Sequence, residues 1–199
     1  MNLETAEVFL EQYGYIALFI GSLIDQSGFP VWVVLAGIFS FLEILSFPAS
    51  FMVILISLFV SDVIWYYVGY MIHKRHQEPG YLEKYSKDSF DTRIYNTIIK
   101  GTEVFSRKKM FFYLLSKTMP IVGKFAPLFA GNNQEEPKSS LALFAMGNIL
   151  YSVVFLLFGS ILGLFAISFS IHITLIITGL FFLLYYIAAK KGQKKYRFW

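Results

Sequence analysis

Four charged side chains interrupt the apolar stretches of this sequence and are its candidates for chemistry. They are two carboxylates, Asp25 and Asp62, and two ammonium groups, Lys117 and Lys124. A charged side chain near the centre of a bilayer costs about 3 kcal/mol on insertion scales, so such residues are usually retained for pairing or for function. Two acids and two bases therefore predict mutual compensation, with the aspartates facing the lysines.

Two interpretations of these charges stay open on the residues alone. In the first, the ion pairs only hold the helices together. In the second, the lysines receive an anionic headgroup while an aspartate exchanges a proton. Half-helix N-termini after Pro30 and Pro120 would add partial positive charge at the same place.

The composition predicts that these charges lie in a membrane protein. Hydrophobic residues make up 56% of the chain and charged residues 15%, with a mean hydropathy of +0.59. An average soluble domain carries about 25% charged residues. Because a soluble fold of this size could not bury so much apolar surface, we expect a single integral membrane domain and not a soluble enzyme.

Several other chemistries lack their residues. The absence of cysteine excludes disulfides, thiolate catalysis and thiolate metal sites. The histidines at 73, 76 and 172 offer no metal cluster, and neither a catalytic triad nor a glycine-rich phosphate loop appears. The net charge of +4 comes from basic residues beside apolar spans, which indicates topology and not nucleic-acid binding. We expect no enzyme activity, no metal and no cofactor.

Long apolar runs predict three membrane spans. The run from Leu141 to Ala189 contains no Asp, Glu, Lys or Arg. As one helix it would be about 73 Å long, against a hydrocarbon core of about 30 Å. We therefore expect two spans there, at 141–167 and 170–189. A third is expected at 47–72, which Asp62 alone interrupts with a charge.

Two further apolar segments predict re-entrant helical hairpins. They cover residues 13–45 and 110–131, and polar residues, proline and glycine break each of them. Each half is too short to cross a bilayer, and irregular backbone at that depth must be buried in protein or line a wet cavity. The expected breaking residues are Pro30, Pro120, Gly123, Pro127 and Gly131. An ordinary kinked span is the alternative.

The basic residues predict the topology. Nine of the 17 lysines and arginines lie between Lys74 and Lys109, and five more lie between Lys190 and Arg197. Positive charge marks the cytoplasmic side of membrane proteins. The C-terminus is therefore expected in the cytoplasm.

The polar segments complete this arrangement. We expect an amphipathic segment at 73–109 and a basic tail at 190–199, both cytoplasmic. The acidic N-terminal segment, 1–12, lacks the positive charge of a signal peptide and falls on the opposite side. The expected fold class is an all-α membrane bundle with two opposed hairpins. Such weak inverted repeats are typical of transporters, whose site lies at mid-membrane.

A motif in the second hairpin resembles a family signature. The stretch from 117 to 131, KTMPIVGKFAPLFAG, is similar to R-F-[IV]-P-G-[IV]-R-[ST]-F-x-P-x-x-A-G of the DedA family, also called the VTT or SNARE-associated Golgi protein family. With lysine counted for arginine, the matching residues are Lys117, Pro120, Phe125, Pro127, Ala130 and Gly131. Gly123 replaces the second arginine, with Lys124 one place on, and lysine lacks the fork that binds phosphate bidentately.

Other segments resemble the same family in order and spacing, over about residues 11 to 163. EQYGYIALFIGSLIDQSGFP resembles its opening, with Asp25 for the usual Glu. SDVIWYYVG resembles G-D-x-x-G-Y-x-x-G and keeps Asp62, Tyr66 and Gly69. GNILY and GSILG resemble two later motifs and keep Gly147, Gly159 and Gly163.

The resemblance implies a function in the bacterial inner membrane. The expected activity is translocation, as flippase or scramblase, of a phospholipid or a polyprenyl-phosphate carrier such as undecaprenyl phosphate, coupled to a proton or sodium gradient. Lys117 and Lys124 would bind the phosphate headgroup, while Asp25 and Asp62 would pair with them or carry a proton. A proton-coupled transporter of small solutes and a structural membrane protein remain alternatives. The lipid, the coupling ion and the oligomeric state, a homo-oligomer included, stay open.

Overall fold

The computed structural model describes residues 3–24, 30–76 and 122–168, together with the single residues 113, 117, 179, 180, 183 and 187. Within these ranges the chain forms helices and no strand. The helices are α1 (Leu3–Ile24), α2 (Val31–Phe41), α3 (Phe47–His76), α7 (Val122–Asn132) and α8 (Pro137–Ser168).

Two of these helices are long and apolar enough to cross a membrane. They are Phe47–Arg75 of α3, with a hydropathy of 2.1, and Pro137–Phe165 of α8, with 2.2. A helix of that length measures about 43 Å, longer than the hydrocarbon core of about 30 Å. Only 33% and 39% of their most apolar windows are buried inside the protein. Most of their apolar side chains therefore face outward, which differs from the mostly buried core helix of a soluble protein.

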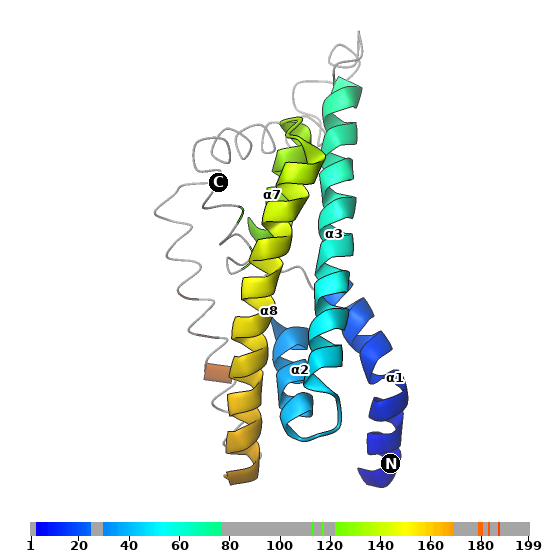
Figure 1. Cartoon of the computed structure of the whole chain (residues 1–199), viewed down its shortest axis with the longest axis vertical. Coiled ribbons are helices and arrows are strands. Elements are labelled where there is room, and N and C mark those ends of the chain that lie inside the picture. The colour runs from blue at the N-terminus through cyan, green and yellow to red at the C-terminus, as the bar shows by residue number, and fades with distance from the viewer. Residues whose placement is uncertain are drawn as a thin grey trace.

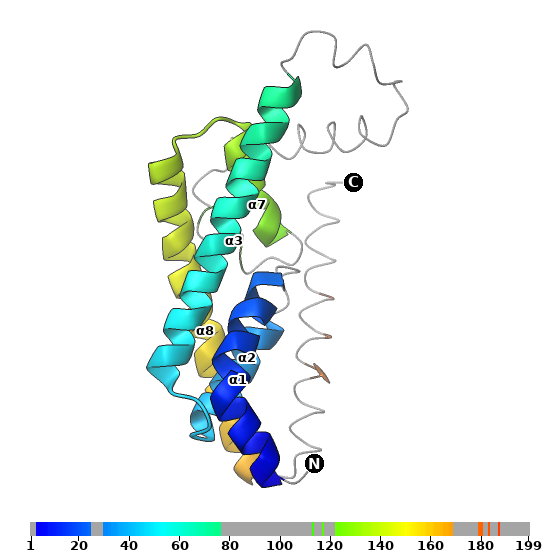
Figure 2. The ribbon, with the colours of Figure 1, turned by 90° about the vertical axis from the view of Figure 1, so that its right-hand side faces the viewer.

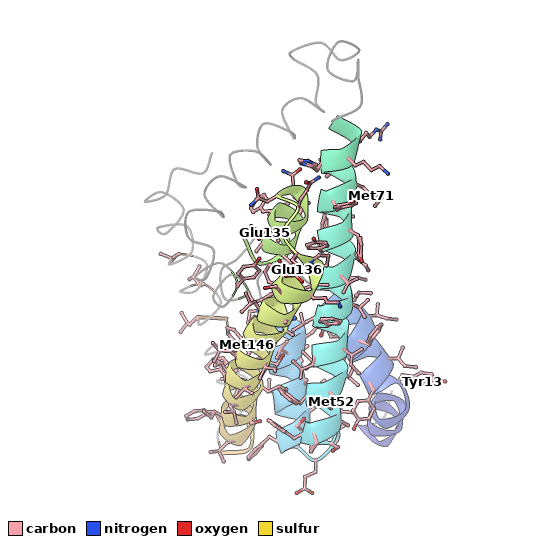
Figure 3. All side chains as sticks on the ribbon, turned by 45° about the horizontal axis from the view of Figure 1, so that its top comes forward. Tyr13, Met52, Met71, Glu135, Glu136 and Met146 are labelled. Carbon is pink, nitrogen blue, oxygen red and sulfur yellow. The ribbon has the colours of Figure 1, made fainter. Side chains whose placement is uncertain are left out.

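The outward-facing side chains are large and apolar on every long helix. Met71 on α3 and Met146 on α8 are more than half exposed, and Tyr13 on α1 is exposed as well (Figure 3). Side chains of this kind would be unfavourable in water over so wide a surface. They are compatible with lipid as the surrounding solvent.

The shorter helices flank different halves of α3. In both ribbon views α1 and α2 lie beside the half that begins at Phe47, whereas α7 lies beside the other half (Figures 1 and 2). The hydroxyl of Ser57 on α3 donates to the carbonyl of Phe19 on α1 at 2.8 Å. α8 runs past both halves, antiparallel to α3 (Figure 1).

Glycines bring the helices into backbone contact at two crossings. A Cβ added at Gly37 of α2 would overlap the carbonyl oxygen of Leu156, and one at Gly159 of α8 would overlap that of Val34. The α3–α7 crossing is built in the same way, since a Cβ at Gly69 or Gly131 would overlap a backbone carbonyl of the other helix. Such contacts require glycine on both partners of each pair.

Three of the expected hairpin breakers lie inside a helix instead. α7 includes Gly123, Pro127 and Gly131. Pro127 lies only six residues into the helix, so it removes a single hydrogen bond near the start. Gly131 serves the crossing with α3 and does not end α7. The segment before Val122, where the expected hairpin would break, lies outside the described residues, so the break itself stays a prediction.

Of two other expected boundaries, one agrees with the helix bounds and one differs from them. Pro30 does precede a helix start, as the N-cap of α2. The separate segment expected at 1–12 is part of α1 from Leu3 onward, because nothing in the sequence ends a helix before Ile24. The expected segment 73–109 lies mostly outside the described residues. The tail at 190–199 does so entirely.

Two buried clusters divide the interior. We name the first the aliphatic cluster; it joins α1, α2, α3 and α8 through Leu18, Val33, Val34, Ala36, Leu45, Ile54, Leu58, Tyr151, Phe155, Leu156 and Leu162. We name the second the tyrosine cluster; it joins α3, α7 and α8 through Tyr66, Tyr113, Ala126, Ala130 and Phe144. Residue 62 of α3 lies between the two.

Candidate functional site

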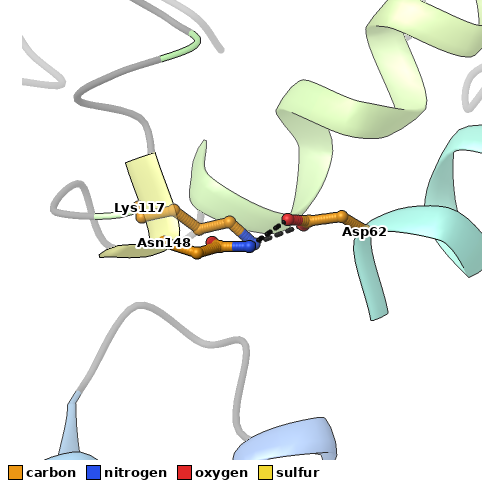
Figure 4. Close-up of polar contacts among 3 residues, drawn as sticks. All are labelled: Asp62, Lys117 and Asn148. Carbon is orange, nitrogen blue, oxygen red and sulfur yellow. Dashed lines mark hydrogen bonds and ion pairs between the residues drawn. The ribbon is translucent and has the colours of Figure 1, made fainter. Parts of the chain in front are cut away.

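A buried ion pair lies between the two clusters. The ammonium group of Lys117 donates to Oδ1 of Asp62 and forms a salt bridge with it (Figure 4). The lysine side chain is 5% exposed and the aspartate side chain 0%. Each charge alone would be very unfavourable at this depth, and their attraction offsets part of the desolvation cost.

Asn148 of α8 completes a trio with these two residues. Its Nδ2 donates to Oδ2 of Asp62 at 2.7 Å, so each carboxylate oxygen has its own donor (Figure 4). An ionised carboxylate only accepts hydrogen bonds, so the amide group, and not the carbonyl group, of Asn148 must face it. This contact links the two apolar helices α3 and α8 through one charged site.

The position of the trio follows from the length of α3. Asp62 lies at the middle of the helix, with about equal numbers of residues before and after it. A helix that spans a bilayer has its middle residue near the centre of the hydrocarbon core. If α3 spans symmetrically, the charges lie near mid-membrane, where transporter sites are found.

The tyrosine cluster closes one side of the site with satisfied hydroxyl groups. Tyr66, one turn after Asp62, donates to the backbone carbonyl of Glu135 in the connection between α7 and α8. The hydroxyl groups of Tyr113 and Ser140 form a buried hydrogen bond of 2.8 Å. These bonds fix the segments on that side of the ion pair.

The opposite side of the site contains polar atoms without partners. Oδ1 of Asn148 and the hydroxyl groups of Ser152 and Ser22 are buried and have no hydrogen-bond partner. All three residues are at most 1% exposed. An unsatisfied buried polar atom costs about 1–3 kcal/mol, so each such atom in a native interior calls for an explanation.

The structure brings together two of the four charges singled out in the sequence, Lys117 and Asp62. Asp25 lies outside the described residues, as does Pro120. Lys124 belongs to α7, but its side chain is outside the described part of the structure. Within that part, no group of three His, Cys, Asp or Glu side chains is placed to hold a metal ion.

Sequence reasoning missed Asn148. It follows Gly147 in the longest run of the chain without a formal charge, and neutral amides carry no such signal. One clue was available, because Asn148 and Ser152 are four residues apart and share a helix face in an otherwise apolar span. A polar stripe of this kind in a membrane helix points inward.

The comparison with curated proteins identifies a relative that is a membrane protein. The chain is 25% identical over 166 residues to the uncharacterized membrane protein YbfM of Bacillus subtilis (strain 168), an alignment that covers 81% of this chain and 98% of that protein. Neither a family model nor a solved structure matches the chain. Together with the two apolar helices, this similarity supports a helical membrane protein.

Proposed function

We propose that this protein is a lipid translocase that moves a phosphate headgroup across the membrane by exchanging Lys117 between Asp62 and the phosphate. The observation that carries the proposal is the buried salt bridge between these two residues at the middle of an apolar helix. Charged residues at such depth mark transport pathways more often than they provide stability, since a buried ion pair contributes little net stability.

The exchange has a simple charge balance. When a phosphate approaches, the ammonium group of Lys117 leaves one anion for another and stays paired. Asp62 keeps the amide of Asn148 but loses its counter-ion. A lone carboxylate in a low-dielectric interior takes up a proton, because burial disfavours its charged form. Headgroup binding is thereby coupled to protonation of Asp62, and a proton gradient would drive it.

The short helices support the finer part of the fold proposal. Tyr13–Ile24 and Val31–Phe41 are apolar, but each has fewer than the roughly 20 residues that a span needs. α1 ends and α2 begins beside the middle of α3 (Figure 2). We propose that α1 and α2 form a re-entrant hairpin from one face, with α7 part of the opposed hairpin.

The family and the location are parts of the same proposal. The DedA resemblance assigns Lys117 the place of a family arginine, and phospholipids or a polyprenyl phosphate such as undecaprenyl phosphate as substrates. From the distribution of basic residues we propose that the C-terminus lies in the cytoplasm and that the chain lies in a bacterial inner membrane. Lys124 and Asp25 are proposed as the second phosphate ligand and a second carboxylate of the pathway.

Transport in liposomes tests the proposal. The purified protein is reconstituted into liposomes with a fluorescent polyprenyl phosphate. A membrane-impermeant quencher then measures how fast the fluorescent lipid appears in the outer leaflet. Lys117→Gln should abolish transport, whereas Lys117→Arg should retain it, because arginine binds phosphate at least as well. The matched control is Lys138→Gln, since Lys138 is exposed at the start of α8.

A double variant separates transport from folding. Asp62→Asn combined with Lys117→Gln removes both charges and leaves no unpaired ion, so the protein should remain folded. Its transport should still be lost. Normal transport by this variant would show that the pair is structural and would remove the proposal. Coupled uptake of a small solute without lipid movement would favour the solute transporter instead.

A further inference from the structure

The side chain of Asn148 is bonded at one end and unpaired at the other. Its Nδ2 donates to Oδ2 of Asp62 at 2.7 Å, whereas its Oδ1 is buried without a partner. Asn148 is 1% exposed, so bulk water does not satisfy that carbonyl group. An unsatisfied buried acceptor is unfavourable. If the trio were only a fixed ion pair, a side chain that donates alone would serve Asp62 equally well without this cost.

Two side chains contact the carboxylate of Asp62, and each occupies one oxygen. Lys117 donates to Oδ1 and Asn148 donates to Oδ2 (Figure 4). Within the part of the chain that the structure describes, no other charged side chain contacts this carboxylate. The nearby hydroxyl groups of Tyr66 and Tyr113 are bonded to other partners. Asn148 is therefore the contact that remains when Lys117 moves to another anion.

The bond from Asn148 determines which oxygen of Asp62 takes up a proton. Oδ2 continues to accept from the amide, so it becomes the carbonyl oxygen of the acid. Oδ1 loses its donor when Lys117 leaves, so the proton binds there. The proton comes from water on one side of the membrane, and the ammonium group keeps its own protons. Lys117 and the incoming proton thus compete for one oxygen, and one proton enters for each departure of the lysine.

A protonated Asp62 has a donor that needs an acceptor. A neutral carboxyl group donates through one oxygen and accepts through the other, and a primary amide carries a matching acceptor and donor side by side. The terminal torsion of asparagine is broad, so a modest rotation brings Oδ1 of Asn148 opposite the new hydroxyl group while Nδ2 stays on Oδ2. The acid and the amide then share two hydrogen bonds. The carbonyl that is unpaired in the ion-paired state gains its partner.

We propose that Asn148 is a positioning residue that holds Asp62 in both protonation states and makes the trio a two-state switch. In one state, Lys117 and Asn148 each donate to the carboxylate. In the other, Lys117 is bound to a different anion, and Asp62 forms a cyclic acid–amide pair with Asn148. This inference rests on the proposed function and adds how its site is regulated. The acid–amide pair stabilises the state in which the lysine is released.

Infrared spectroscopy of the full-length protein at neutral pH tests the acid–amide pair. Lys117→Met removes the ammonium group and leaves Asp62 buried without a counter-ion, so the aspartate should be protonated and show a carboxylic-acid C=O band. Exposed carboxyl groups are ionised at this pH and contribute nothing to that band. Combining Lys117→Met with Asp62→Asn should remove the band, which assigns it to Asp62.

The frequency of the band reports the hydrogen bonds of the acid. With Asn148 in place the band should lie at the low-frequency end of the acid region, because both the carbonyl and the hydroxyl group are bonded. Adding Asn148→Leu to Lys117→Met should shift it to higher frequency by more than its own width, since leucine is similar in size but neither donates nor accepts. The matched control is Ser152→Ala in the same background. Ser152 is buried one turn along the same face of α8 and makes no hydrogen bond, so this change should leave the frequency as it was.

Three results would overturn the switch. They are an unchanged band after Asn148→Leu, no band that Asp62→Asn removes, and a band in Lys117→Met at the high-frequency end, which is typical of an acid without hydrogen bonds. The last result needs no change at Asn148, so it decides the matter even if the leucine variant does not fold. Loss of transport in Lys117→Gln alongside any of them would leave the proposed function standing. Normal transport in Lys117→Gln would overturn the proposed function itself, whatever the band shows.

Discussion

The two halves of the bundle are joined by similar helix crossings but treat their polar groups differently. Both crossings depend on glycine, with Gly37 and Gly159 in one and Gly69 and Gly131 in the other. In the tyrosine cluster, the buried hydroxyl groups of Tyr66 and Tyr113 have partners. Near the aliphatic cluster, the hydroxyl groups of Ser22 and Ser152 have none.

This difference concerns the hydroxyl groups named here, which have partners on the α7 side of the ion pair and none at Ser22 and Ser152. Satisfied hydroxyl groups fix the α7 side, where a ligand would have to break existing hydrogen bonds. The buried charges lie at the boundary, and Asn148 contacts the carboxylate with one end and turns an unpaired oxygen away with the other.

The largest effect is expected at that boundary. Asp62→Asn leaves the ammonium group of Lys117 buried without its counter-ion, which should cost about 3–5 kcal/mol. Adding Lys117→Gln should recover most of that loss, because the two effects are not additive for residues in contact. Thermal unfolding of the single and the double variant in one detergent measures both the loss of stability and its recovery. Additive losses would contradict a stabilising contact between the two charges.

The glycine crossings should respond alike in the two halves. Gly131→Ala and Gly159→Ala each place a Cβ against a backbone carbonyl, so each should cost at least about 1–3 kcal/mol. Gly179→Ala is the control, since nothing lies within 4 Å of its added Cβ. Unfolding temperatures compare the three variants. If only one crossing is sensitive, the two halves differ in packing as well as in polarity.

The tyrosine cluster should lose stability when a hydroxyl is removed. Tyr113→Phe deletes one partner of the buried bond and leaves the Ser140 hydroxyl without it. The expected loss is about 1–2 kcal/mol. Thermal unfolding of Tyr113→Phe measures this loss of stability. Tyr67→Phe is the control, because Tyr67 is exposed on α3. Equal stability of the two variants would remove the contrast between the halves.

The smallest effect separates two serines at the α1–α3 contact. Ser57→Ala removes a hydrogen bond to the carbonyl of Phe19 and should cost about 1 kcal/mol. Ser22→Ala removes an unpartnered hydroxyl and should cost nothing, or stabilise slightly. A loss for Ser22→Ala as large as that for Ser57→Ala would mean that the Ser22 hydroxyl has a partner.

Parts of the site could be predicted from the residues because charges in apolar segments are rare. Asp62 and Lys117 stand out as charges, and their opposite signs already favour a pair. The sequence could not choose between pairings, since residues 55 positions apart meet only through the packing of several helices. Asn148 escaped notice because a neutral amide is conspicuous only when its environment is known.

The sequence by itself determined that lipid surrounds this protein and that its long apolar runs form helices. Apolar runs of the length of α3 and α8 form helices in lipid whatever their neighbours, because every backbone group must find its partner within the segment. The tertiary structure alone decided the roles of Pro127 and Gly131 within α7 and the contact of Asn148 with Asp62. Those depend on helix register and close approach, and register is set by side chains and glycines on two helices at once, so neither segment contains it alone.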